Sequence, residues 1–344
     1  MSIGRVAPRP AGTGVAKGRA VDKIERDLLA RIARRFYLED MSKTELAAAF
    51  RMSRFRVARL LEQARAEGIV KIEIEETGLV EEELSSRLAA HLRLDDCTVV
   101  PAGETEEDNR QRLARAAAMY ITSQAHSGDV LGFSWGRTLV ALGEYLGSLP
   151  PCTVLQLTGT VGNDLTKSPV EVIRRIADRA DVSTVAIFCP LFAASATAAA
   201  LLREDPAIHG ATALYTKLAL AVLSVGSWDP PITQLAGFFS PQDHRELADR
   251  HAKAEMAGIF VREDGSLVDA AVVERRISVS VAELLSTPRV LAVAGSVEKV
   301  GAIAAVVRSG LVTALVTDDH AAAALLRLPP VTAHVLERGG VAGS

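Results

Sequence analysis

The sequence predicts an α/β protein with two parts: an N-terminal winged helix-turn-helix domain and a larger, Rossmann-like domain built on a parallel sheet. Three observations support this prediction. Helical periodicity and capping signals dominate residues 21–68, and a period-two apolar pattern follows at residues 69–75. From about residue 95 onward, short apolar runs alternate with helical patterns. At 344 residues the chain is long enough for two domains of ordinary size.

The first 20 residues are expected to form a disordered arm, because they contain prolines and four glycines but almost no large apolar residues. A helix is predicted next, from about residue 22 to residue 39. Apolar side chains recur along it at helical spacing, at Ile24, Leu28, Ile32 and Phe36.

Residues 42–68 predict two short helices joined by a tight turn. Ser42 and Glu45 have the S-x-x-E spacing of a capping box. Ser53 can cap the second helix, and Gly68 suits the left-handed position after its end. A small apolar seam would pack the two helices together, formed by Ala47, Phe50, Val57 and Leu60.

The second of these helices carries arginines in its early turns, where a helix-turn-helix protein meets the DNA major groove. Residues 1–72 hold 16 basic and 8 acidic residues, a net charge of +8; the whole chain, with 39 and 42, has −3, so the remainder has −11. A basic segment is often only a solvated face, but here the charge falls on the predicted motif and suits phosphate neutralisation. The residues predicted to contact DNA are Lys43, Thr44, Ser53, Arg54, Phe55, Arg56 and Arg59.

Two roles stay open within this set. Phe55 either touches a thymine methyl group or packs against the protein. Which of the arginines reads a base and which positions a phosphate also stays open, with phosphate positioning the alternative for Arg59. The alternating segment 69–75 is predicted to be a strand, the wing that completes a domain of residues 21–77. Residues 78–94 are expected to be a linker, with a helix at 81–92 for which a dimer-forming role is an option.

Residues 95–338 are predicted to form the second domain, followed by a flexible tail at 339–344. The predicted buried strands are CTVVP, DVLGFSW, TVLQLTG, STVAIF, LALAVLSVG, AGIFV, RVLAVAG and LVTALVTD. The predicted helices between them are 109–126, 137–147, 168–179, 241–251, 298–308 and 319–326. This alternation predicts a parallel sheet covered on both faces, with a ligand site beyond the carboxyl ends of its strands.

Four of the predicted strand ends finish in small or polar residues, at 132–138, 157–163, 224–227 and 293–299. In the first, free loop amides and the Thr138 hydroxyl are suited to hold an anion such as a sugar phosphate. In the last, Lys299 is placed to reach back to a bound oxyanion. One such loop is ordinary turn chemistry, but four on one edge predict a small-molecule pocket.

Other chemistry is not supported by the spacing of reactive residues. GFSWG has the outline of a nucleophile elbow around Ser134, but no triad partners can be assigned to it. His244 and His251 are seven residues apart on a predicted helix, without a metal-ligand partner, and are expected to be exposed or packed. Three widely spaced cysteines argue against disulfides or a zinc site and suit a reducing cytoplasm. We therefore predict no catalytic residue, metal or cofactor.

No membrane partner is predicted either. No apolar core follows the charged N-terminus, so a signal peptide is not expected. The longest uncharged span, residues 182–202, is long enough to cross a bilayer. Its proline, hydroxyl residues and alanines fit better with a buried strand at 183–188, a loop and an alanine-rich helix. The sequence thus predicts a soluble, cytoplasmic protein.

Three segments together resemble the sorbitol-operon regulator (SorC/DeoR-like) family of bacterial transcription factors. They are MSKTELAAAFRMSRFRVARLLEQARAEGIVKI, GDVLGFSWGRTL and VAGSVEKVGAIAAVVRSGLVTALVTDDHAA, and the similarity covers nearly the whole chain beyond residue 20. The resemblance implies a winged-helix domain joined to a sugar-binding domain related to sugar-phosphate isomerases and deaminases. It also implies a homotetramer, or dimer of dimers, whose DNA affinity responds to a sugar, sugar alcohol or phosphosugar.

Carried over by position, Gly136 and Thr138 fall in the family's W-G-x-T ligand loop, and Lys299 matches the lysine after its G-G turn, whose second glycine is Ser296 here. Where the family has F-F-D-x-D-G, Arg262 replaces the first aspartate. Arginine prefers carboxylate or phosphate, so either the effector differs or Asp264 takes over. The predicted effector-binding residues are Ser134, Trp135 (alternatively a core residue), Gly136, Arg137, Thr138, Gly159, Thr160, Gly162, Gly226, Ser227, Arg262, Asp264, Gly295 and Lys299.

The sequence therefore predicts a transcriptional regulator, such as a repressor. It is expected to bind the double-stranded operator DNA of a carbohydrate or polyol catabolic operon. Effector binding is expected to close the strand-end loops and shift the spacing of paired DNA-binding domains. Two alternatives remain. One is a sugar-phosphate isomerase or deaminase with an accessory DNA-binding head, and the other is a second domain that serves mainly as an oligomerisation scaffold.

Overall fold

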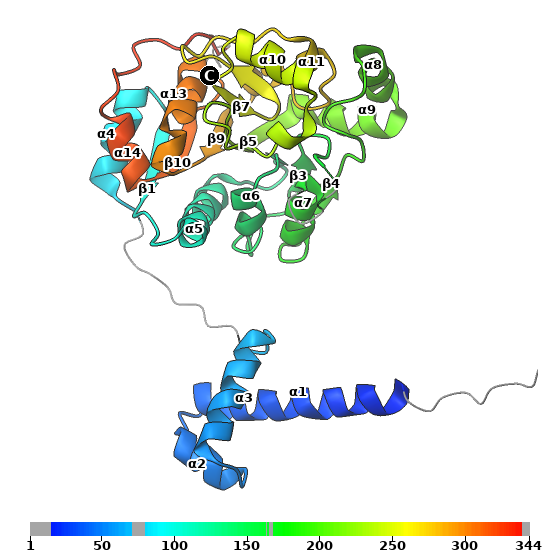
Figure 1. Cartoon of the computed structure of the whole chain (residues 1–344), viewed down its shortest axis with the longest axis vertical. Coiled ribbons are helices and arrows are strands. Elements are labelled where there is room, and N and C mark those ends of the chain that lie inside the picture. Colours follow the sequence, from blue (N-terminus) through cyan, green and yellow to red (C-terminus); the bar gives the residue numbers. More distant parts are fainter. Residues whose placement is uncertain (1–14, 71–79, 163, 165–167, 339–344) are drawn as a thin grey trace, which may run out of the picture. The chain divides into compact units, whose positions relative to one another are not determined.

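The structure, a computed structural model, describes residues 15–70, 80–162, 164 and 168–338, with the backbone alone for residues 15–25. The chain divides into two compact units, residues 1–77 and residues 78–344 (Figure 1). None of the helices in these described ranges is long and apolar enough to span a membrane.

The described part of the first unit consists of the helices α1 (Val15–Tyr37), α2 (Lys43–Ala49) and α3 (Arg54–Ala66). The predicted capping box begins α2: the Ser42 hydroxyl accepts the Glu45 amide at 3.2 Å, and the Ser42 amide donates to the Glu45 carboxylate at 2.8 Å. Ser53 caps α3, and Gly68 has the predicted left-handed conformation after its end, with φ +68°. The predicted helix pair is therefore present.

The predicted disordered arm is wrong for its last residues, because α1 already begins at Val15. The segment VAKGRA contains good helix formers, which the proline and glycine content of the first fourteen residues obscured. Residues 1–14 lie outside the described residues. So does most of the predicted wing strand, 71–75; only its first two residues are described, and the amides of Ile69 and Val70 donate to the Ala64 carbonyl.

Burial holds the three helices of this unit together. Of the predicted seam, Val57 and Leu60 are buried, while Ala47 and Phe50 pack against the core from its edge. The remaining buried side chains come from α1, the middle of α2 and the second half of α3: Leu29, Ile32, Ala33, Leu46, Leu61 and Ala64.

A parallel sheet of seven described strands forms the centre of the second unit, in the order β1-β10-β9-β5-β2-β3-β4. Its strands are β1 (Asp96–Val100), β2 (Val130–Phe133), β3 (Thr153–Gln156), β4 (Ser183–Val185), β5 (Leu218–Ser224), β9 (Arg289–Val293) and β10 (Ala314–Asp318). The chain runs outward from β2 to β4 in one direction and from β5 to β10 in the other. The topological switch point, where open α/β sheets bind ligands, therefore lies between β5 and β2.

Side chains alternate between two apolar cores on the two faces of this sheet. On β5, Leu220 and Val222 join the core under α5 (Glu106–Gln124), α6 (Arg137–Leu142) and α7 (Pro169–Ala177). Ala221 and Leu223 join the opposite core with α4 (Glu82–Leu92), α12 (Val281–Ser286), α13 (Val300–Ser309) and α14 (Asp319–Leu325). Both faces are covered, which confirms the predicted fold class.

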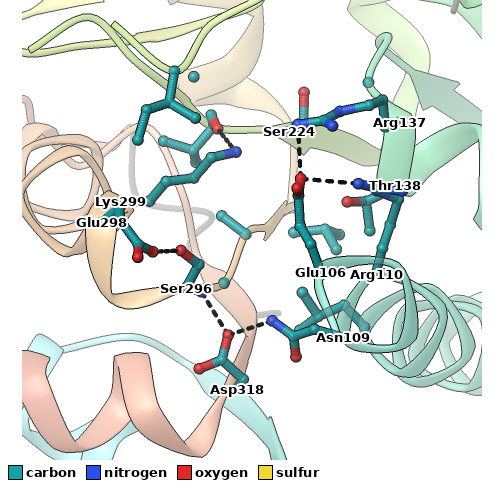
Figure 2. A pocket seen from close by; sticks show the side chains of 18 of the residues that line it. Glu106, Asn109, Arg110, Arg137, Thr138, Ser224, Ser296, Glu298, Lys299 and Asp318 are labelled. Atoms are coloured by element: carbon teal, nitrogen blue, oxygen red, sulfur yellow. Dashed lines mark hydrogen bonds and ion pairs between the residues drawn. The ribbon is translucent and has the colours of Figure 1, made fainter. Parts of the chain in front are cut away.

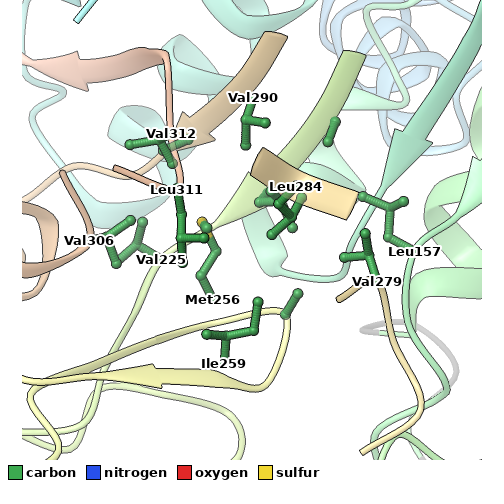
Figure 3. Packing of buried hydrophobic residues seen from close by; sticks show 14 of the residues in the cluster. Leu157, Val225, Met256, Ile259, Val279, Leu284, Val290, Val306, Leu311 and Val312 are labelled. Carbon is green, nitrogen blue, oxygen red and sulfur yellow. The ribbon is translucent and has the colours of Figure 1, made fainter. Parts of the chain in front are cut away.

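One predicted strand belongs to a different sheet. AGIFV supplies β8 (Ile259–Val261), which pairs with β7 (Ala254–Met256) and through it with β6 (Gly226–Ser227) in an antiparallel sheet. A two-residue turn with positive φ at Ala257 and Gly258 makes β7 and β8 a hairpin. A short, fully buried apolar run looks the same in either sheet, so its pattern could not reveal the pairing. Figure 3 shows Met256 and Ile259 of this hairpin packed near Val225 and Leu311.

Two further segments differ from expectation. The predicted buried strand at 183–188 is the short strand β4, which ends the sheet order with Ser183 and Thr184 exposed. The predicted linker helix, α4, packs into the second unit: Leu88 and Leu92 are buried, and the Ser85 hydroxyl accepts the Val99 amide of β1 at 2.9 Å. The remaining described helices are α8 (Ala196–Glu204), α9 (Pro206–Thr212), α10 (Pro241–Asp249) and α11 (Ala271–Glu274), with 3₁₀ turns η2 (Ala213–Lys217), η3 (Ala236–Phe238) and η4 (Val297–Lys299).

Candidate functional site

A cavity of about 590 Å³ lies at the carboxyl ends of the parallel strands, where β1, β2, β5, β9 and β10 end. This is the position predicted for a ligand in such a sheet. Its lining includes loop residues after each of these strands, the first turns of α5, and two residues of the antiparallel sheet, Gly226 and Glu255. The size suits one small organic molecule.

The loop after β2 is fixed to the neighbouring strand. Gly136 has φ +142°, and a Cβ atom there would lie 2.8 Å from the Ser224 Oγ atom. The Ser224 hydroxyl donates to the Trp135 carbonyl at 2.6 Å. Glycine is thus required at 136, and the tight turn presents Arg137 and Thr138 to the cavity.

Glu255 is the most unusual group in the lining, because its side chain is buried. It accepts hydrogen bonds from the Thr233 hydroxyl at 2.9 Å and from the Gly258 amide at 3.3 Å. Burial raises the pKa of its carboxyl group to about 7. Gly226 leaves room for this group, since a Cβ atom at 226 would overlap the carboxylate.

Lys299 lies in the same cavity as Arg110 and Arg137. Its ammonium group donates a hydrogen bond to the Val225 carbonyl at 3.1 Å. Burial lowers its pKa, and the positive charge of Arg137 lowers it further, whereas Glu255 and Glu106 act in the opposite direction. The ionic groups of the cavity therefore influence one another.

Glu106 bridges two arginines at the cavity wall. One oxygen of its carboxylate, Oε1, lies 2.9 Å from Arg110 and 3.0 Å from Arg137. Figure 2 shows the carboxylate between the two arginine side chains. Arg110 also pairs with Glu107. The two arginines come from different elements, the first turns of α5 and α6, so the carboxylate joins the two helices.

Asp318 organises the opposite side of the cavity. The residue is completely buried at the end of β10, and its Oδ2 atom accepts the Ser296 amide at 2.6 Å and the Asn109 amide group at 3.0 Å. Its Oδ1 atom accepts the Ala321 amide at 2.8 Å and so caps α14. Asp318 therefore positions the loop after β9 against α5.

The structure brings half of the predicted effector residues into this cavity: Trp135, Gly136, Arg137, Thr138, Gly226, Gly295 and Lys299. It places the other half outside the lining: Ser134, Gly159, Thr160, Gly162, Ser227, Arg262 and Asp264. Trp135 is among the lining residues, and its side chain is 3% exposed within an apolar cluster, as expected for a core residue.

Arg262 and Asp264 form the turn after β8. The Arg262 guanidinium donates to the carbonyls of Arg250 and Leu267, and the Asp264 carboxylate accepts the Ser266 amide at 2.9 Å. The arginine that replaces the family's aspartate thus ties two loops together in this structure. Ser134 is 1% exposed, and its hydroxyl is 3.4 Å from the Trp135 carbonyl, so it is not presented as a nucleophile.

The segment 159–160 is held away from the cavity by backbone pairing. The Gly159 amide donates to the Ile277 carbonyl and the Thr160 amide to the Cys189 carbonyl. These bonds fasten the loop after β3 to segments beyond β4 and before α12. The small and polar residues at the end of β3 correctly predicted a loop, but they did not predict that the loop would lie outside the cavity lining.

Sequence reasoning did not identify Glu255, Glu106, Arg110 or Asn109 as cavity residues. A charged residue between Ala254 and Met256, in an apolar strand, was the available signal for Glu255. Glu106 and Arg110 have the i, i+4 spacing of an ordinary solvated helix face, so their pattern did not distinguish them.

His244 and the cysteines, which were considered as metal ligands from the sequence, are packed in the second unit. His244 stacks on Trp228 with ring centroids 5.3 Å apart, and its Nε2 atom is 2.7 Å from the Ala236 carbonyl. The three cysteines are buried and free. Within the described ranges, no cluster of histidine, cysteine, aspartate or glutamate side chains is suited to hold a metal ion.

In the first unit, every residue predicted to contact DNA is exposed. Phe55 is 79% exposed, so it does not pack into the core. The Arg54 guanidinium carbon lies 5.7 Å from the centre of its ring. The Ser53 hydroxyl accepts the Arg56 amide at 3.2 Å and so serves first as the cap of α3. The N-terminal turn of α3 therefore presents arginine and an aromatic ring together.

The chain thus combines a helix pair with an exposed basic turn and a cavity of small-molecule size, and comparison with known proteins gives the family. Residues 79–327 match the family described as "Putative sugar-binding domain". The chain belongs to this family. The predicted resemblance to sorbitol-operon regulators is confirmed by the same match together with the relatives.

The similarity to proteins named as transcriptional regulators extends over most of this chain and most of each relative. The uncharacterized transcriptional regulator YjhU of Escherichia coli is 28% identical over 301 residues, covering 85% of this chain and 92% of that protein. The erythritol catabolism regulatory protein EryD of Brucella abortus is 28% identical over 309 residues, covering 88% and 97%. The full-length sorbitol operon regulator SorC of Klebsiella pneumoniae shares the fold, with a TM-score of 0.69, 22% identity and coverage of 88% and 98%.

Proposed function

We propose that this chain is a DNA-binding transcriptional regulator of a carbohydrate or polyol catabolic operon, controlled by a sugar, sugar alcohol or phosphosugar. The observation that carries the proposal is the exposed N-terminal turn of α3, where Arg54, Phe55 and Arg56 follow the capping residue of a helix-turn-helix pair. Relatives named as regulators of erythritol catabolism and of the sorbitol operon support the same class.

The cavity suits a hydroxylated effector. The Glu255 carboxyl group is an acceptor for ligand hydroxyls, and Arg137, Thr138 and Lys299 supply donors along the walls. The other predicted effector residues, including Arg262 and Asp264, would join only through movement of their loops.

Effector binding would draw the strand-end loops together and change the spacing of paired DNA-binding units in a homotetramer or dimer of dimers. Because the two binding events share one conformational equilibrium, the effector and the DNA must change each other's affinity by the same factor. In this proposal the protein acts in the cytoplasm on double-stranded operator DNA.

A role as a sugar-phosphate isomerase or deaminase is the lesser candidate. The proposal treats the chain as a non-enzyme, because Ser134 is buried and the relatives are named as regulators. Incubating any ligand found in a binding screen with the chain and assaying turnover separates the two candidates.

DNA binding can be tested with the promoter region of the chain's own operon. We expect Arg54→Ala and Arg56→Ala each to weaken binding about tenfold or more, as measured by fluorescence anisotropy, since a bidentate arginine–base contact contributes about 1–3 kcal/mol. The matched control is Arg87→Ala, which removes an exposed arginine of α4 in the second unit. Unchanged affinity in both α3 variants would refute the assignment of α3 as the recognition helix.

A further inference from the structure

The Glu106 carboxylate occupies the position of a bound oxyanion. A single oxygen atom, Oε1, accepts hydrogen bonds from Arg110 and is within ion-pair distance of Arg137, at 2.9 and 3.0 Å. Two guanidinium groups from different helices that converge on one oxygen are the arrangement by which proteins bind phosphate or carboxylate ligands. Here the oxygen belongs to the protein itself (Figure 2).

The exposure of the three side chains indicates which partner is held loosely. Arg110 is 14% exposed and Arg137 46% exposed, whereas the Glu106 side chain is 72% exposed. An ion pair with so exposed a carboxylate is weak, because water competes for the Glu106 oxygens. A ligand that offers two or three oxygens to the same guanidinium groups can therefore replace the carboxylate.

The cavity lining holds three basic side chains, Arg110, Arg137 and Lys299, beside five carboxylates. Lys299 lies in the same cavity, and the charges of Arg137, Arg110, Glu106 and Glu255 all influence its titration. The Glu255 carboxylate already accepts hydrogen bonds from Thr233 and Gly258. Once Glu106 moves aside, the cavity wall presents one ammonium group and two guanidinium groups, of which Arg110 stays paired with Glu107.

We infer that Glu106 is a built-in competitor at an oxyanion subsite of the cavity, and that it determines which effectors bind. An anionic effector, with a phosphate or carboxylate group, must displace the Glu106 carboxylate from Arg110 and Arg137. A neutral sugar or polyol leaves this ion pair in place. The inference rests on the proposed function in treating the cavity as the effector site, and it names Glu106 as a selectivity residue.

Inorganic phosphate is the probe that tests this inference without knowledge of the effector. The full chain is titrated with phosphate at constant ionic strength and pH 7.5, and the apparent Kd is obtained from the rise in its unfolding temperature. Glu106→Gln keeps the shape of the side chain and removes its charge. We expect this variant to bind phosphate about three- to tenfold more tightly than the wild type.

The controls separate competition from a general charge effect. Glu83→Gln removes a carboxylate from the first turn of α4 that also pairs with an arginine four residues on, outside the cavity, and should leave the phosphate Kd unchanged. Arg137→Ala should weaken phosphate binding about tenfold. In the Arg137→Ala background, the gain from Glu106→Gln should shrink, because the competitor has lost one of its two partners.

Equal phosphate affinity of the wild type and Glu106→Gln would overturn the inference. So would a gain of undiminished size in the Arg137→Ala background, or an absence of saturable phosphate binding by every variant. Promoter binding is measured on the same preparations. A chain that bound phosphate in the expected pattern but did not bind its promoter would refute the proposed function and leave the inference standing.

Discussion

At the scale of single residues, Glu255 places a carboxyl group inside the second unit next to the ligand cavity. Its burial is compensated by the Thr233 hydroxyl and the Gly258 amide, which do not fully replace water. A pKa near 7 means that the group changes its charge in the range of ordinary cellular pH. The stability of this unit is therefore linked to pH through this one residue.

The raised pKa gives a signed prediction for stability. Glu255 titrates at about 4.5 when exposed and at about 7 in the folded protein, so its stabilising contribution is fully present below pH 4.5. That contribution is lost as the pH rises through 7, because the folded state must then hold a buried negative charge. The loss should amount to about 3 kcal/mol in total. Urea denaturation at several pH values measures it.

Glu255→Gln should remove this pH dependence. The unfolding free energy of the wild type minus that of Glu255→Gln should fall from pH 4.5 to pH 8, because only the wild type gains the buried charge. The exposed substitution Glu83→Gln should follow the wild type throughout. A difference that stayed constant or increased with pH would show that the carboxyl group is not buried as described.

Residue roles could be predicted only where a local pattern carried them. The W-G-x-T loop and Lys299 were found because the turn and lysine have a fixed spacing, and both line the cavity. Arg262 also occupies a motif position, that of the first aspartate in F-F-D-x-D-G. Its side chain nevertheless donates hydrogen bonds to the carbonyls of Arg250 and Leu267 and does not line the cavity. The direction of a side chain depends on what packs around it, and a single sequence does not contain that information.

At the scale of secondary-structure elements, capping sets the start of the helices that form the DNA-binding unit. Ser42 and Glu45 satisfy each other's backbone amides at the start of α2, a helix of seven residues that is too short to be stable alone. Its orientation therefore depends on the cap and on the burial of Leu46.

Ser42→Ala should loosen this helix. Loss of an N-cap serine costs about 1 kcal/mol, so amide exchange of Glu45 and Leu46 should accelerate about fivefold. Hydrogen exchange followed by NMR measures this effect, with Ser86→Ala on the exposed face of α4 as control. Unchanged exchange at Glu45 would show that the cap does not hold α2.

The strands were predicted well, but their partners were not. Each apolar run proposed as a strand contains one, because buried parallel strands are continuous apolar segments. The AGIFV run and the exposed strand β4 show the limit of that signal. Strand length and apolarity are local, whereas the choice of sheet and the position at its edge depend on distant segments.

At the scale of the whole molecule, the charge of the chain is divided between its two functions. The basic segment contains the helix-turn-helix pair, and the acidic remainder contains the cavity. The structure forms two compact units, residues 1–77 and residues 78–344. The proposed coupling between them is a property of the assembled protein, and it has to be measured as an equilibrium.

The most direct test measures promoter affinity and ligand affinity together in three proteins: the wild type, Arg54→Ala and Lys299→Ala. A thermal-shift screen of sugars, polyols and their phosphates supplies the ligand, and anisotropy gives the DNA affinity with and without it. We predict that the ligand changes DNA affinity in the wild type. Arg54→Ala should bind DNA about tenfold or more weakly but keep the ligand shift, and Lys299→Ala should keep DNA binding but lose the ligand shift. If the screen yields no ligand that changes DNA affinity, or if either variant loses both functions while folded, the central claim is contradicted.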